Sequence, residues 1–217
     1  MTDRKADTKC FYELMDRLEQ RVGGPHLLKD FMSVVAPTEK GVYFIFEPEE
    51  YRIDSREKLR VVRVGTHGLI ADSRSTIWTR LFEHLMANGR SVFRSQVNQA
   101  LKCAGHDEGS TGRDHSERIT RRIGSMRFLW VRVNGDNDHT ERKYIETNTI
   151  KLLSARNSNA THQPSPNWLG KHSNKSEVRC SGLWNVQHTK PGDYNSEFLN
   201  DLENCIRVTE ASDWSER

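Results

Sequence analysis

The stretch RKYIETNTIKLLS, residues 142–154, carries an acidic residue in an unusual position. If the stretch forms a helix, Ile150 and Leu153 lie four and seven residues after Glu146, so the carboxylate shares their apolar stripe. Burial of an unpaired carboxylate is costly. We therefore expect either that the stripe ends in a solvated cleft at Glu146, or that a basic side chain or a metal ion meets the carboxylate there.

Two further residues that could do chemistry, Arg80 and His84, are four positions apart in the stretch TRLFEH. On a helix they share one face. A guanidinium is always charged and can hold a phosphate through forked hydrogen bonds. Each residue also has an ordinary explanation: Arg80 and His84 would form a solvated helix face, and Glu146 would be capped or salt-bridged to Arg142 or Lys143.

Length and composition limit the kinds of protein that this chain can be. Its 217 residues allow one core of roughly 100 to 150 residues with extensions, or one larger α/β domain. Charged residues make up 29% and the mean hydropathy is -0.79, and no apolar run reaches the roughly 18 residues that a membrane helix needs. The charged N-terminus lacks the apolar core of a secretory signal, so we expect a cytoplasmic protein with no membrane partner.

The cysteines and histidines give little sign of a zinc site or a disulfide framework. The 4 cysteines are scattered without a CxxC pair, which is typical of reduced thiols. The 9 histidines form neither an HxH nor an HxxxH pair. A net charge of +3 permits a polyanionic partner without demonstrating one.

The periodicity of apolar residues predicts the elements that position these side chains. Strands are expected at 41–48, where Pro48 closes the run, and at 59–65, paired as a hairpin through a charged loop. A third strand is expected at 126–133. The polar 104–118 segment and the 157–195 tail are expected to be loops. Helices are expected at 9–22, 75–89, 91–104, 115–123, the Glu146 stretch and 195–208. In the tail, we expect Trp168 and Trp184 to anchor local packing rather than to stack on bases.

Four short motifs now form a pattern. GVY stands at 41–43, RVG at 63–65, Arg80 follows in a helix, and Glu146 lies in IETNTIK after a third strand. In this order and spacing they resemble the GIY-YIG nuclease superfamily, over about residues 40 to 160. His84 resembles a histidine that restriction endonucleases of the family carry one turn after the arginine.

The resemblance implies an α/β fold with a β-β-α-α-β-α core, in which helices flank a three-stranded antiparallel sheet. It divides the chain into an N-terminal helical extension at 1–38, a nuclease domain at 39–160 and a C-terminal extension at 161–217. Specificity would come from the extensions and the 104–118 insertion.

The resemblance also implies a metal-dependent DNA endonuclease, with a restriction or defence role. Glu146 would bind one Mg2+ or Mn2+. Tyr43, otherwise a core aromatic, would orient or deprotonate the attacking water, and Arg80 would hold the scissile phosphate. His67 would contact phosphate or act as a base. A homodimer would be needed to cut both strands of a palindromic site.

One departure from the family pattern leaves an alternative open. Arg63 stands where most members have tyrosine, and Thr66 follows the glycine where many have lysine. Arg63 could hold phosphate or help Tyr43 to ionise, or it could mark a degenerate site in a protein that binds nucleic acid without cutting it. The family also has an asparagine some twelve residues after the glutamate; Asn157 and Asn159 straddle that position, so it is not assigned.

Overall fold

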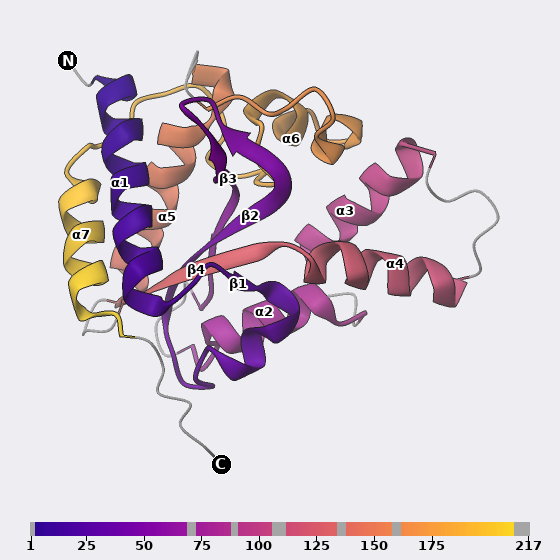
Figure 1. The fold of residues 1–217 in the computed structure, drawn as a ribbon, viewed down its shortest axis with the longest axis horizontal. Coiled ribbons are helices and arrows are strands. Elements are labelled where there is room, and N and C mark those ends of the chain that lie inside the picture. Colours follow the sequence, from indigo (N-terminus) through magenta and orange to yellow (C-terminus); the bar gives the residue numbers. More distant parts are fainter. Residues whose placement is uncertain are drawn as a thin grey trace.

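The sheet forms the centre of the molecule. In the computed structural model, which describes residues 3–68, 73–87, 91–105, 112–133, 138–157 and 162–210, it is antiparallel and four-stranded, in the order β1-β4-β2-β3 (Figure 1). The predicted α/β class is confirmed, and a two-residue edge strand adds to the three predicted strands. The strands are β1 (His26–Leu27), β2 (Gly41–Arg52), β3 (Ser55–Thr66) and β4 (Arg127–Arg132).

The β2–β3 hairpin is longer than predicted, because the expected charged loop is mostly strand. The register between the strands shifts after Phe46, where Pro48 and Glu49 (φ 69°) follow, and pairing resumes at Tyr51, opposite Leu59. A bulge accommodates a proline that a regular ladder would exclude. The prediction that Pro48 ends the strand was therefore wrong.

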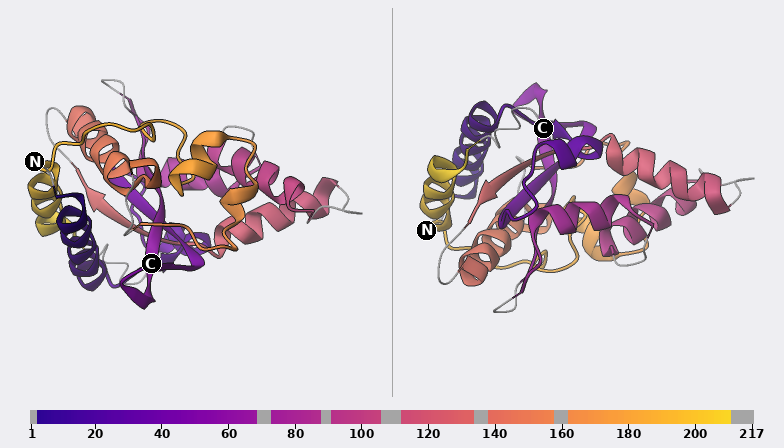
Figure 2. Two further views of the ribbon diagram at one scale, coloured as in Figure 1. Left: turned by 90° about the horizontal axis from the view of Figure 1, so that it is seen from above. Right: turned by 90° about the horizontal axis from the view of Figure 1, so that it is seen from below.

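Three helices lie together beside the sheet (Figures 1 and 2). They are α1 (Arg4–Val22), α5 (Asp138–Leu153) and α7 (Phe198–Val208), of which α1 and α7 contact β4 while α5 contacts β3. The apolar spacing of α1 buries Phe11, whose ring meets that of Phe44 at 5.9 Å. Within the described ranges, no helix has the length and apolar character needed to cross a bilayer.

Three more helices follow the hairpin: α2 (Ile77–Leu85), α3 (Val92–Cys103) and α4 (Gly112–Gly124). Thr76 caps α2 by accepting a hydrogen bond from the Thr79 N–H. The predicted stop at Gly89 lies outside the described residues. α3 and α4 extend side by side away from the sheet (Figures 1 and 2). Of the expected 104–118 loop, the part from Gly112 is helical, and 106–111 lies outside the described ranges.

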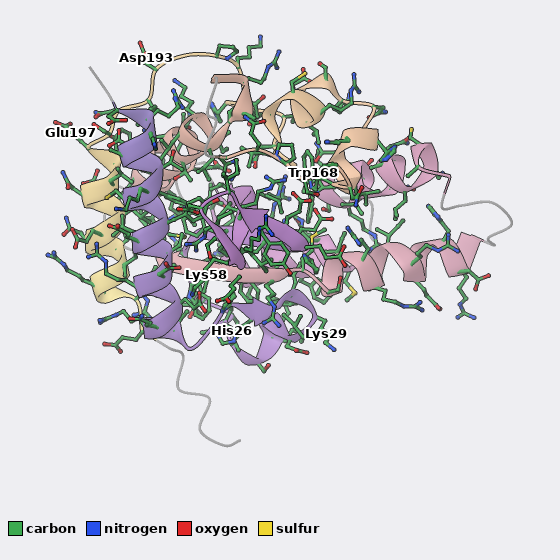
Figure 3. All side chains as sticks on the ribbon, turned by 45° about the horizontal axis from the view of Figure 1, so that its top comes forward. His26, Lys29, Lys58, Trp168, Asp193 and Glu197 are labelled. Carbon is green, nitrogen blue, oxygen red and sulfur yellow. The ribbon has the colours of Figure 1, made fainter. Side chains whose placement is uncertain are left out.

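The segment after α5 contains three short helical turns where a loop was expected: η2 (Ala155–Asn157), η3 (Leu169–His172) and α6 (Ser176–Ser181). Figure 3 shows Trp168 on this segment, close to α3. The indole N–H groups of Trp168 and Trp184 donate to the same oxygen of Glu47, at 2.9 and 3.0 Å. Both tryptophans are buried, so they are the packing anchors that the sequence favoured.

Glu47 joins the sheet to the C-terminal segment and to α4. Its side chain is 0% exposed, and its second carboxylate oxygen accepts a hydrogen bond from Arg122. A buried charge is tolerated when hydrogen bonds and an opposite charge surround it in this way.

Glu47→Gln should therefore lower the free energy of unfolding by about 2–3 kcal/mol, because it removes the charge facing Arg122 and places an amide among groups that donate hydrogen bonds. Urea denaturation measures the loss. Glu13→Gln is the control, because Glu13 is exposed and pairs weakly with Lys9 at 3.8 Å. This substitution should change the free energy of unfolding by no more than about 0.5 kcal/mol. An equally small loss for Glu47→Gln would contradict this account of the C-terminal segment.

Candidate active site

The glycines of GVY and RVG are required by close contacts between strands. A Cβ atom on Gly65 would lie 2.2 Å from the hydroxyl oxygen of Tyr43, its partner across the β2–β3 ladder. A Cβ on Gly41 would lie 1.8 Å from the carbonyl oxygen of Val131 on β4. Gly65 therefore provides the space that the Tyr43 phenol occupies, and Gly41 allows β4 to approach β2.

Tyr43 is the first member of a buried hydrogen-bonded chain. Its hydroxyl lies 2.7 Å from Nε2 of His84, and the other ring nitrogen of His84 lies 2.8 Å from Oγ of Ser91. Ser91 caps α3 by accepting a hydrogen bond from the Arg94 N–H at 3.0 Å. Burial lowers the pKa of His84 well below its ordinary value, and the charges of Arg63 and Arg80 lower it further. The imidazole is therefore neutral at physiological pH.

Arg80 lies one helical turn before His84 and reaches the same phenol. It donates a hydrogen bond to Glu83 at 2.8 Å. Burial acts to lower the pKa of Arg80, but Tyr43 and Glu83 outweigh burial, so that the pKa is raised. The guanidinium thus stays charged beside Tyr43.

Glu146 lies on α5 close to both arginines and to the end of β3. Burial raises the pKa of its carboxyl from 4.5 to about 7, against the opposing effects of Arg63, a hydrogen bond from the Thr66 backbone, and Arg80. Arg142 does not pair with it: Arg142 forms an ion pair with Asp138 at 2.7 Å and donates to the Gly68 carbonyl. Positive groups therefore meet the carboxylate, which is one of the two situations expected from the sequence.

These side chains border one cleft of about 220 Å3. The sheet and the helices contribute Arg63, Gly65, Arg80 and Glu146 to its wall. Tyr43 is buried against Gly65, beside the same wall. The structure thus brings together Tyr43, Arg63, Arg80, His84 and Glu146, which are spread over more than 100 residues of sequence.

Arg63 is fixed by residues far away in the sequence. Its guanidinium donates to the carbonyl of Trp184 at 3.0 Å and lies 4.9 Å from the centre of the Phe93 ring. From this position its charge affects both Glu146 and His84. Arg63 therefore supplies positive charge to the cleft wall where most family members carry a tyrosine.

His67 has a different environment. Its Nε2 accepts a hydrogen bond from the Gly41 N–H at 3.1 Å, and it is absent from the described residues that line the cleft. Burial, with a further contribution from Arg142, lowers its pKa to about 4. The ring is neutral and holds the start of β2.

Part of the remaining wall comes from residues of the C-terminal segment that the sequence did not indicate: Asn185, Gln187 and His188. The Asn185 side chain forms two hydrogen bonds with the backbone of Val64 on β3, as a paired strand would. It accepts one from the Val64 N–H at 3.1 Å and donates one to the Val64 carbonyl at 2.8 Å. His188 has a φ of 61°, which is uncommon for a residue other than glycine. Neither side chain stands in a motif or a periodic pattern, so no local signal could have found them.

Comparison with known proteins agrees with this geometry. The family model described as GIY-YIG domain matches residues 2–212. The chain belongs to the GIY-YIG domain family. The match extends beyond residues 40 to 160, where the motifs lie, and includes α1 and the C-terminal segment. Neither the search of curated proteins nor the search of solved structures found a match.

GIY-YIG nucleases generally depend on a divalent metal ion, and the cleft fits one. In the part of the chain that the structure describes, no three His, Cys, Asp or Glu side chains gather to form a ligand set. Among the described residues that line the cleft, Glu146 is the one acidic side chain, so it is the candidate to hold such an ion. Mg2+ accepts such a site, because it keeps several waters and completes its shell with phosphate oxygens. A carboxyl that loses its proton near neutral pH can also exchange that proton for a cation.

The raised pKa predicts how Glu146 affects stability. The carboxyl keeps its proton to a higher pH in the folded chain than in the unfolded chain, so stability falls as the pH rises from 4.5 to about 7. Glutamine does not titrate. In the presence of a chelator, Glu146→Gln should therefore be more stable than wild type by roughly 2–3 kcal/mol at pH 8, and equal to it near pH 4.

Thermal or urea unfolding at a series of pH values measures this difference, with the exposed Glu13→Gln as the matched control. A difference between Glu146→Gln and wild type that does not vary with pH would show that the Glu146 carboxylate is solvated.

Proposed function

We propose that this GIY-YIG domain is a metal-dependent endonuclease that hydrolyses phosphodiester bonds of DNA. The observation that carries the proposal is the convergence of Arg80 and Glu146 on one cleft, beside the hydrogen-bonded pair of Tyr43 and His84. Phosphodiester hydrolysis needs an activated water, positive charge around the phosphoryl oxygens, and support for the departing oxygen.

Tyr43, as a phenolate that has already given its hydroxyl proton to solvent, would take the proton of the attacking water. Because the Arg94 N–H donates to Ser91, the Ser91 hydroxyl proton is free for Nδ1 of His84, and Nε2–H then donates to the Tyr43 oxygen. This oxygen is thereby held as an acceptor, with the charged Arg80 beside it. The water oxygen forms the new bond to phosphorus as the bond to the leaving sugar oxygen breaks, and the leaving oxygen takes a proton from solvent in the cleft.

The two arginines would hold the phosphate. Arg80 presents a charged fork on the cleft wall, and Arg63 adds a second positive charge from a fixed position. Arg63 thus offers a charge that stabilises the transition state, which favours activity over decay of the site. In this proposal His67 supports β2 and does not contact phosphate.

Glu146 would hold the metal ion, as Mg2+ or Mn2+. The chemistry supplied there by a bound divalent ion is neutralisation of the charge that grows on the phosphoryl oxygens. The carboxylate itself gives the ion a fixed position relative to Arg80.

We also propose a restriction or defence role, because restriction endonucleases of this family similarly extend a small core. The predicted division places such extensions, at 1–38 and 161–217, on either side of the 39–160 domain in the sequence. Cutting both strands of a palindromic site would require a second copy of the chain. Sedimentation of the chain with and without DNA tests for that homodimer.

The test of the proposed function is nicking of plasmid DNA in Mg2+ or Mn2+. Wild type should cut, and Glu146→Gln should lose cleavage while it still folds and binds DNA, because the amide keeps the shape but loses the charge that holds the ion. Glu13→Gln on α1 should cut like wild type. Cleavage by Glu146→Gln would exclude Glu146 as the metal ligand. Binding of DNA by wild type without cleavage in either metal would favour the alternative of a degenerate site.

Arg80→Lys should lower the cleavage rate on the order of 100-fold, because lysine keeps the charge and loses the fork that matches a phosphate. Single-turnover cleavage measures the rate. Arg17→Lys is the control, since Arg17 is an exposed α1 residue paired with Glu203. If Arg80→Lys cuts at the wild-type rate, Arg80 does not hold the scissile phosphate.

A further inference from the structure

α3 has an outer face without charge that begins at the cleft. Val92, Ser95, Gln96 and Gln99 are spaced so that they share one face, while Phe93 and the other apolar residues of the helix are buried on the opposite face. Val92 is 54% exposed, which is unusual for a large apolar side chain.

A second hollow continues from the cleft along this face. It measures about 510 Å3 and lies between α3 and the C-terminal segment. Val92, Gln96 and Val186 line both the cleft and this hollow, so the two are neighbours; we name the hollow the α3 groove. A nucleic acid strand whose phosphate lies at Arg80 would have its neighbouring nucleotide in the α3 groove.

Gln96 is the residue on the shared wall that points most directly to a ligand. Its side chain is 4% exposed, and its carbonyl oxygen has no hydrogen-bond partner among the described residues. A buried carbonyl oxygen without a donor costs about 1–3 kcal/mol, and such groups are rare in folded proteins. Among the described residues the oxygen therefore lacks the donor that a buried carbonyl normally has.

The chemistry of the α3 groove suits bases better than phosphates. Apart from Val92 and Val186, its lining carries the amides of Gln96, Gln99 and Asn174. It also has one positive and one negative side chain, Lys175 and Glu177, so its net charge is zero. Phosphates are held mainly by cationic groups, whereas base edges are distinguished by amide side chains and apolar contacts.

We infer that the α3 groove reads the base next to the cleaved phosphodiester. The carbonyl oxygen of Gln96 accepts a hydrogen bond from an amino group of that nucleobase, and Val92 packs against the same nucleotide. This inference rests on the proposed function for the position of the phosphate, and it makes Gln96 a specificity-determining residue.

The test mixes the 217-residue chain with a DNA pool of randomised sequence. The first readout, in Mg2+, is the identity of the bases that flank the cleaved bonds. The second readout, with Ca2+ in place of Mg2+, is the set of sequences that the protein binds. Wild type should favour bases that present an amino group at one flanking position. Gln96→Met keeps the length of the side chain and removes its polar atoms, so it should lose this preference on the order of tenfold. Gln20→Met, on the exposed face of α1, should keep it.

The outcomes separate this inference from the proposed function. If wild type does not cut but retains a base preference that Gln96→Met loses, base reading stands and the nuclease proposal fails. An unchanged preference in Gln96→Met, or no preference in wild type in either readout, overturns base reading. A higher Mg2+ requirement in Gln96→Met also overturns it, because Gln96 would then serve the metal.

A stability measurement checks the premise. Gln96→Met should have a melting temperature equal to or above that of wild type, since it removes a buried polar group that has no partner. A fall of several degrees would show that the Gln96 amide is satisfied within the free protein, which would also overturn the inference.

Discussion

The candidate site depends on a Glu146 carboxyl that is partly buried near the guanidinium groups of Arg63 and Arg80. Burial favours the protonated form, Arg63 and Arg80 favour the charged form, and the pKa of about 7 is the result. The balance leaves a carboxyl that titrates near physiological pH, as the proposed exchange of its proton for a cation requires.

The residues around Glu146 constrain one another. Gly65 gives the Tyr43 phenol its place, His84 fixes the phenolic oxygen, and Ser91 both fixes His84 and starts α3. Arg63 is held by Trp184, which also binds Glu47. The C-terminal segment is thus part of the site, because it positions an arginine and forms one wall of the cleft.

Much of this could be predicted from the sequence, because local patterns determine it. The spacing of apolar residues predicted the main helices and strands in the right order, and the position of Glu146 on an apolar stripe indicated either a solvated cleft or a positive partner. Features that depend on distant contacts could not be predicted. Glu47 stands at the end of the predicted 41–48 strand, where the charged stretch begins, yet it is bound by tryptophans 121 and 137 residues later. Asn185 reaches the cleft wall only because its amide pairs with the edge of β3.

The titration of the Glu146 carboxyl tests this account most directly. Its side-chain carbon can be followed by 13C NMR as the pH is raised, first with a chelator and then with Mg2+. The account predicts a pKa of about 7 with the chelator and a lower pKa with Mg2+, because the cation competes with the proton. A pKa near the ordinary 4.5 that does not respond to Mg2+ would contradict it.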